Sequence, residues 1–245
     1  MRFIDSHVHL SDYADPGTVI RVAGLTRMIL GAVSIDKRTS AGTLALSHQA
    51  PGIVKGFVGV HPSEAGKAGD MGWVEEWVGG AAGVGEVGMD EKYLNESPIK
   101  DQEKAFSSQL ATAEKAGKPV QVHTRGKEAA CLETMTSFGL KRALLHWFQD
   151  GGLSSKAADR GYFVSFGPAL LYSKKLQKLA MAYDRQLVIA ETDGPVAFRH
   201  LGGAEGPTLI PSVVFCLSEI YGEPFDEVAN RVERNSLGYL GIEKG

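Results

Sequence analysis

The segment Ile99–Arg125, IKDQEKAFSSQLATAEKAGKPVQVHTR, predicts a helix followed by a buried strand. Phe106, Leu110 and Ala113 recur at helical spacing across residues 99–116, and the following Gly117 is a typical helix C-terminus. Pro119 then opens a short apolar run that ends at His123. A short apolar run of this kind is typical of a parallel strand that is buried on both faces. The segment therefore predicts one helix–strand unit of an α/β fold.

Seven more apolar runs resemble Pro119–His123, and longer amphipathic segments separate them. Further helices are predicted over 127–138, 173–183, 212–221 and 224–239, and the last two follow the eighth run and close the outside of the barrel. Eight alternating units predict a (β/α)8 TIM barrel. The other seven predicted strands are Arg2–Val8, Arg27–Val33, Val54–Val60, Ala82–Val87, Arg142–His146, Tyr162–Phe166 and Gln186–Ala190.

Composition agrees with one ordinary globular unit. The 245 residues are 43% hydrophobic and 22% charged, which excludes disordered, collagen-like and coiled-coil classes. Because barrels of about 250 residues commonly form one domain, we expect residues 1–245 to be a single domain. No leader-like segment or membrane-length apolar run occurs, and Cys131 and Cys216 form no Cys-x-x-Cys pair, so a cytoplasmic location without a membrane partner is expected.

The net charge is −3, and no basic run indicates a nucleic-acid-binding surface. This balance does not exclude an enzyme that holds phosphates through metal ions, because bound cations can be the largest charges in a site.

Histidines gather at the predicted strand ends. Five of the seven lie at or just past the carboxyl end of a strand, which in a barrel is the active-site rim. A single histidine at such a position is often only a hydrogen-bonded cap, but five coinciding ends favour a metal site. These five are His7, His9, His61, His123 and His146.

Two carboxylates belong to the same pattern. Glu86 interrupts an apolar run, and Asp193 follows the eighth strand. An unpaired buried carboxylate is unfavourable unless a metal or strong donors compensate it. Imidazole and carboxylate ligands together suit Zn²⁺, Mn²⁺ or a similar ion.

Neighbouring polar residues have predicted supporting roles. Glu191 shares the face of Asp193 by two-residue alternation, and we expect it to hold a ligand in place rather than bind the ion. Arg125 shares a face with His123, which places its guanidinium where an anionic substrate would lie. A surface ion pair is the alternative for Arg125. Trp147 directly follows His146 and is expected to line the pocket, whereas Trp73 and Trp77 have the spacing of a helix's core face.

The sequence resembles the TatD family of metal-dependent deoxyribonucleases within the amidohydrolase-type barrels. Its motifs occur in the family's order and span nearly the whole chain. They are Asp5-Ser6-His7-Val8-His9-Leu10, Gly59-Val60-His61-Pro62, Gly85-Glu86-Val87-Gly88-Met89-Asp90, Pro119-Val120-Gln121-Val122-His123-Thr124-Arg125, His146-Trp147-Phe148 and Glu191-Thr192-Asp193-Gly194-Pro195. The chain departs from the family after the eighth strand, because residues 198–207 lack the asparagine that usually precedes the proline.

The resemblance implies a (β/α)8 barrel with two divalent ions, Zn²⁺, Mn²⁺ or Mg²⁺. It assigns His7, His9 and Asp193 to one ion and His123 and His146 to the other, with Glu86 bridging both. His61 would contact a substrate phosphate. In that arrangement Asp193 and Glu86 are the catalytic carboxylates: Asp193 orients the activated water and accepts its proton, and Glu86 remains ionised.

The expected function is metal-dependent hydrolysis of phosphodiester bonds, with single-stranded DNA as the substrate of a TatD-like DNase. A hydrolase of the same barrel acting on a small amide, ester or lactone is the first alternative, because a binuclear site activates water for a carbonyl equally well. The second alternative is a metal-binding barrel without catalysis. No oligomeric state is predicted.

Overall fold

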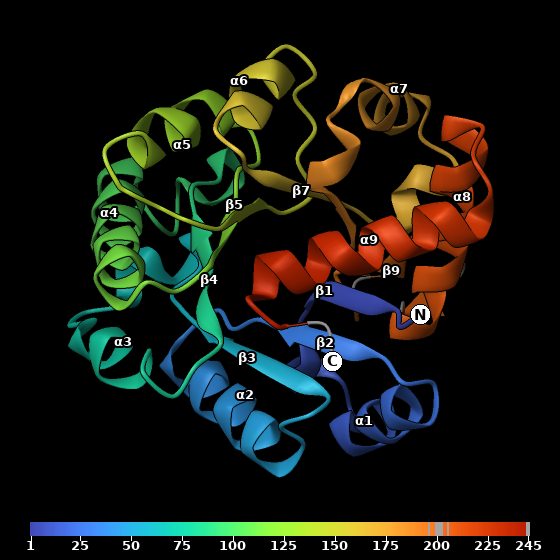
Figure 1. Cartoon of the computed structure of the whole chain (residues 1–245). Coiled ribbons are helices and arrows are strands. Elements are labelled where there is room, and N and C mark those ends of the chain that lie inside the picture. The colour runs from blue at the N-terminus through green and yellow to red at the C-terminus, as the bar shows by residue number, and fades with distance from the viewer. Residues whose placement is uncertain (196, 199–202, 205, 244–245) are drawn as a thin grey trace.

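A computed structural model describes residues 1–195, 197–198, 203–204 and 206–243. Eight parallel strands form one sheet in chain order and curve into a nearly closed barrel surrounded by helices (Figure 1). The predicted (β/α)8 fold is confirmed, and one strand is found in each predicted run, with β4 extending one residue past the predicted end at Val87. The strands are β1 (Ile4–Val8), β2 (Ile29–Ala32), β3 (Val54–Val58), β4 (Gly83–Gly88), β5 (Val120–His123), β6 (Ala143–Leu145), β7 (Phe163–Phe166) and β8 (Val188–Ala190).

The barrel closes between β8 and β1 through the residues that follow β8. The Asp193 amide donates to the His7 carbonyl at 2.9 Å, and the His9 amide donates to the Gly194 carbonyl at 2.8 Å. The Asp5 carboxylate also accepts from the Thr192 amide at 2.9 Å. This seam therefore joins two of the sequence motifs that lie at opposite ends of the chain.

Helices cover the outside of the sheet. The helix predicted over 99–116 is found with those bounds as α4, and it ends at Gly117, which has a φ of +63°. Helix α1 was not predicted, although Asp15 caps it at the Thr18 amide and Pro16 opens it. The α-helices are α1 (Pro16–Leu25), α2 (Lys37–Gln49), α3 (Gly72–Trp77), α4 (Ile99–Ala116), α5 (Glu128–Met135), α6 (Ser154–Asp159), α7 (Lys174–Ala182), α8 (Ile210–Tyr221) and α9 (Phe225–Leu240).

Helix α9 differs from the expectation that it lies on the outside. It crosses the amino-terminal end of the barrel (Figure 1), where Tyr239 stacks on Phe57 with ring centroids 6.3 Å apart. The Tyr239 hydroxyl donates to the Val120 carbonyl at 3.0 Å, at the start of β5. Leu237 and Leu240 join the same buried cluster inside the strands. The carboxyl end of the barrel is left for the functional site.

The two remaining strands, β9 (Ala197–Phe198) and β10 (Gly203–Ala204), pair antiparallel beyond β8. The rest of the segment between Pro195 and Gly206, where the chain departs from the family motif, lies outside the described residues. Among the helices that the structure describes, none is long and apolar enough to cross a membrane.

Candidate metal centre

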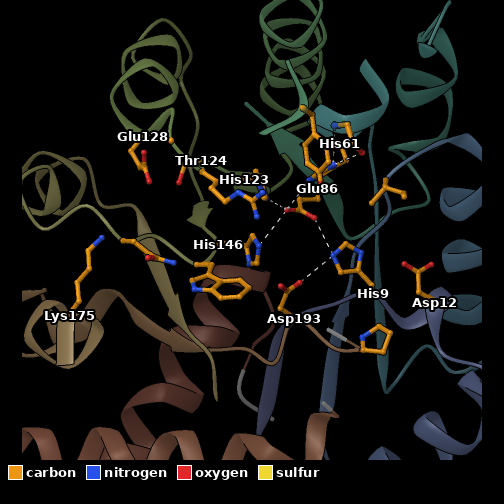
Figure 2. A pocket seen from close by; sticks show the side chains of 18 residues that line it. His9, Asp12, His61, Glu86, His123, Thr124, Glu128, His146, Lys175 and Asp193 are labelled. Carbon is orange, nitrogen blue, oxygen red and sulfur yellow. Dashed lines mark hydrogen bonds and ion pairs between the residues drawn. The ribbon is translucent and has the colours of Figure 1, made fainter. Parts of the chain in front are cut away.

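Glu86, on β4, is the centre of the polar cluster at the carboxyl end of the barrel (Figure 2). Its two carboxylate oxygens face different groups of histidines. Oε2 lies 3.6 Å from Nε2 of His7 and 3.3 Å from Nε2 of His9. Oε1 lies 2.6 Å from Nδ1 of His123 and 3.5 Å from Nε2 of His146. The Glu86 side chain is almost completely buried, so its carboxylate is surrounded by these imidazoles and not by water.

Asp193 joins the group around Oε2 of Glu86. Its Oδ1 lies 3.5 Å from Nε2 of His7 and 3.4 Å from Nε2 of His9. Its backbone has a φ of +56°, a left-handed conformation that is uncommon for a residue other than glycine. Bonds from the preceding Thr192 to Asp5 hold this turn, one from the amide and one from the hydroxyl at 2.5 Å. Asp5 thus positions Asp193 from beneath, and burial raises the pKa of Asp5 to about 8 against the lowering effect of these bonds.

His7 is completely buried, and only one of its ring nitrogens has a partner. Nδ1 donates to Oε1 of Gln121 at 2.7 Å, because the Gln121 amide nitrogen itself donates to the Ser6 carbonyl at 2.8 Å. Nε2 has no hydrogen-bond partner among the described residues. The amide therefore fixes a tautomer whose bare Nε2 points towards Glu86 and Asp193, which is the form that binds a metal ion.

His146 has a carboxylate in the corresponding position. Its Nδ1 lies 3.0 Å from Oε2 of Glu191, which also accepts from the Ser165 hydroxyl at 2.5 Å. Oε1 of Glu191 accepts from the Trp147 amide at 3.2 Å. Glu191 thus lies behind His146, and Nε2 of His146 faces the centre.

The electrostatics of the cluster follow from burial and from mutual contact. Burial raises the pKa of Glu86, but His61, His7 and His146 outweigh it and hold this pKa well below its usual value. Burial lowers the pKa of His9, yet hydrogen bonds to Asp193 and Glu86 raise it to about 10. The pKa of His7 lies well below its usual value because of burial and the stacked His146 ring.

These residues fit divalent cations. The described structure brings together ligand atoms in the groups His7–His146–Asp193, His7–His9–Glu86 and His61–Glu86–His123, each within 4.8 Å. The bare, buried Nε2 of His7 needs a partner that accepts its lone pair, and a metal ion is such a partner. An ion would also compensate the negative charges of Glu86 and Asp193, which are almost completely buried.

His61 lies at the edge of this cluster, with Nε2 3.7 Å from Oε1 of Glu86. Its Nδ1 accepts from the Ser63 amide at 3.1 Å, which leaves the proton of the neutral ring on Nε2. Burial lowers the pKa of His61 to about 3, so the ring is neutral. His61 therefore offers a hydrogen-bond donor to the site.

The cluster forms the floor of a cavity of about 780 Å³ (Figure 2). Arg125 lines it with its side chain half exposed, and its Nε lies 3.3 Å from Oδ2 of Asp90. Arg125 therefore forms an ion pair and also lines the cavity, and its contact with a substrate stays a prediction. Trp147 lines the wall as expected, and its backbone has a φ of +44°. Lys175, Asp12 and Glu128 lie farther out.

Sequence reasoning gave no role to Gln121, Asp90 or Ser165, which contact His7, His123 and Glu191. Their signal was a polar residue inside or directly after an apolar run, as in Val120-Gln121-Val122. Trp73 and Trp77 lie on α3 with rings 5.1 Å apart and pack against the core, as predicted.

The family model for TatD-related DNases matches residues 4–241. This chain belongs to the TatD family. The human deoxyribonuclease TATDN3 is 24% identical over 255 residues, covering 96% of this chain and 93% of that protein. The uncharacterized metal-dependent hydrolase YcfH of Escherichia coli K12 is 27% identical over 174 residues, covering 67% of this chain and 64% of that protein.

The crystal structure of YJJV, a TatD homologue from Escherichia coli, superimposes with a TM-score of 0.87 at 21% identity and covers 98% of each chain. At this identity the likeness shows the shared barrel. Together with the family match, these relatives confirm the predicted class of metal-dependent hydrolase acting on ester bonds.

Proposed function

We propose that this TatD-family chain hydrolyses phosphodiester bonds of single-stranded DNA with two divalent ions. The observation that carries the proposal is the division of Glu86: one carboxylate oxygen faces His7 and His9, and the other faces His123 and His146. A carboxylate with ligands gathered at each oxygen suits a bridge between two ions. His7, His9 and Asp193 would hold one ion, His123 and His146 would hold the other, and Glu86 would contact both.

The donor set favours Zn²⁺ or Mn²⁺ over Mg²⁺, because four imidazoles are nitrogen ligands and Mg²⁺ prefers oxygen. When bound, a pair of such ions activates water and stabilises the charge on the phosphate oxygens.

The chain's own groups supply the remaining steps. Asp193 carries its negative charge at neutral pH, since His146 and His9 outweigh the effect of burial and lower its pKa. Its carboxylate orients the attacking water and accepts a proton from it. The Nε2–H of His61 donates to a phosphate oxygen, and the Arg125 guanidinium adds positive charge beside it. Glu191 and Gln121 hold His146 and His7 in the required tautomers.

The second candidate function is hydrolysis of a small anionic ester, amide or lactone. It is favoured by the composition of the cavity wall, where Arg125 and Lys175 are balanced by Asp12 and Glu128. A long DNA strand gains affinity from many cationic contacts, whereas a small anion needs only one or two.

The test is cleavage of end-labelled single-stranded DNA by metal-stripped protein reloaded with Mn²⁺, Zn²⁺ or Mg²⁺. The decisive variant is Glu86→Gln, which keeps the side-chain size and removes the bridging charge. Glu233→Gln is the matched control, because Glu233, on α9 at the other end of the barrel, is also buried but pairs with Arg2. Metal-restored cleavage that is lost only in Glu86→Gln supports the proposal. Two bound ions without DNA cleavage, together with hydrolysis of small esters, would favour the second candidate.

A further inference from the structure

Asp90 lies two residues after the end of β4 and is completely buried, and both its amide and its carbonyl are hydrogen-bonded. Its amide donates to Oε1 of Gln102 at 2.8 Å, and its carbonyl accepts from the Gln102 amide nitrogen at 3.1 Å. Oδ1 accepts from the Lys92 amide at 2.7 Å. The side chain is therefore fixed from one side, and its other oxygen, Oδ2, has a fixed direction.

That second oxygen contacts His123 and Arg125. It lies 2.7 Å from Nε2 of His123 and 3.3 Å from Nε of Arg125. Asp90 thus connects a candidate metal ligand on β5 to the positively charged side chain that lines the cavity two residues later.

His123 has a carboxylate at each ring nitrogen, because Nδ1 lies 2.6 Å from Oε1 of Glu86. Only Nδ1 faces the cluster around Glu86, so His123 can bind an ion there through Nδ1 alone. A neutral imidazole with a bare Nδ1 carries its proton on Nε2, and that proton needs an acceptor. Oδ2 of Asp90 is in the place of this acceptor.

We propose that Asp90 is a positioning residue that holds His123 in the Nε2–H tautomer for metal binding and anchors Arg125 beside the substrate. The inference rests on the proposed role of His123 as a metal ligand. His123 would then bind its ion through Nδ1, whereas His7 and His146 face the centre with Nε2.

An asparagine at position 90 cannot satisfy both neighbours. If its oxygen accepts from the Lys92 amide, its NH2 group faces Nε2 of His123 and selects the opposite tautomer, with the proton on Nδ1. If its oxygen faces His123, its NH2 group opposes the Lys92 N–H. Asp90→Asn therefore changes the tautomer, or the cap, with almost no change in size.

The experiment measures metal binding without nucleic acid. Titration of metal-stripped wild-type protein with Zn²⁺ by calorimetry gives the affinity of each binding event. We expect Asp90→Asn to weaken one event 10–100-fold and to leave the other unchanged. Arg125→Met should leave both affinities unchanged, which separates the metal effect from the loss of the arginine.

Asp184→Asn is the matched control for loss of a cap, because Asp184 accepts from the Gln186 amide at 2.9 Å in a similar short turn away from the site. It should bind both ions with wild-type affinity. Unchanged affinity for both ions in an Asp90→Asn variant that is as stable in urea as the wild type, and so has kept the Lys92 cap, would overturn the proposal.

A second measurement keeps the inference testable if Asp90→Asn does not fold. ¹⁵N-histidine spectra of the zinc-loaded wild-type protein report which nitrogen of each ring is metal-bound, and the signal of His123 is identified by its loss in His123→Asn. We expect His123 bound through Nδ1 with a proton on Nε2. A His123 bound through Nε2 would refute the role of Asp90, whether or not the protein cleaves DNA. Absence of DNA cleavage with the expected spectrum would instead refute only the proposed substrate.

Discussion

Replacing Gln121 by leucine tests whether an uncharged amide prepares His7 for its ion. In the wild-type protein the Gln121 side chain accepts from Nδ1 of His7 and donates to the Ser6 carbonyl, and all three residues are buried. Leucine fills a similar volume and can do neither. His7 then keeps a buried Nδ1–H without an acceptor, or it moves the proton to Nε2 and loses the lone pair that faces Glu86.

The magnitude follows from these two possibilities. A buried group that loses its hydrogen-bond partner lowers the free energy of unfolding by about 1–3 kcal/mol. Loss of a residue that orients a metal-bound histidine weakens metal affinity about 10–100-fold, equivalent to about 1.4–2.8 kcal/mol. We therefore expect Gln121→Leu to lose stability in the metal-free protein and to lose affinity for one ion in addition.

Urea unfolding in the presence of a chelator measures the first effect, and calorimetric titration with Zn²⁺ measures the second. Gln109→Leu is the matched control: Gln109 is also a buried amide, and it bonds the Val60 amide at 2.7 Å and the Val60 carbonyl at 3.1 Å without touching the proposed ligands. It should lose similar stability but no metal affinity. If both variants bound Zn²⁺ equally well, Gln121 would be an ordinary structural residue and the explanation of the bare Nε2 would be wrong.

Three further outcomes are expected. Saturating Zn²⁺ or Mn²⁺ should raise the melting temperature, with each ion adding about 2.7 kcal/mol at 100 times its Kd, and an unchanged melting temperature would contradict ion binding to the folded state. Burial raises the pKa of the Cys131 thiol to about 12, so the folded state holds this proton more tightly than the unfolded state. The urea unfolding free energy should therefore fall as pH rises above about 9, by at most about 1.4 kcal/mol per pH unit for this group, and an equally steep fall in Cys131→Ala would refute that origin. Gly88→Ala should destabilise the fold by about 3 kcal/mol or more, because Gly88 has a φ of +141° and a Cβ there would lie 2.0 Å from the His123 carbonyl oxygen. Gly52→Ala is its control, with no atom within 4 Å of the added methyl group, and equal stability of the two variants in urea would contradict the expectation.

The barrel could be predicted from the sequence because its strands are buried on both faces. Runs such as Ala143-Leu144-Leu145 and Val188-Ile189-Ala190 are short, apolar and separated by helical patterns, and local sequence alone identifies such units. The position of α9 could not be predicted in the same way. Its apolar face is visible in the sequence, but whether Tyr239 packs on the outside or against Phe57 depends on the closed barrel.

The proposed ligands could also be predicted from the sequence, since histidines and carboxylates at the strand ends of a barrel lie on one rim. The residues that orient these ligands could not be predicted in this way. Gln121 and His7 are 114 residues apart in sequence, and their 2.7 Å contact depends on how the sheet curves. The contact of Asp90 with His123 likewise depends on β4 and β5 pairing with Gly88 opposite His123.

These partners make the two halves of the proposed centre chemically different. His7 is oriented by the neutral amide of Gln121, whereas His146 and His123 are oriented by the carboxylates of Glu191 and Asp90. A carboxylate partner makes an imidazole a more basic ligand than an amide does. The half around Oε1 of Glu86 therefore contains the two imidazoles that carboxylates orient from behind, and the half around Oε2 contains the additional carboxylate of Asp193. Both halves thus contain negative charge besides that of Glu86. In the Oε2 half it comes from the proposed ligand Asp193, and in the Oε1 half it comes from Glu191 and Asp90, which lie behind the histidines.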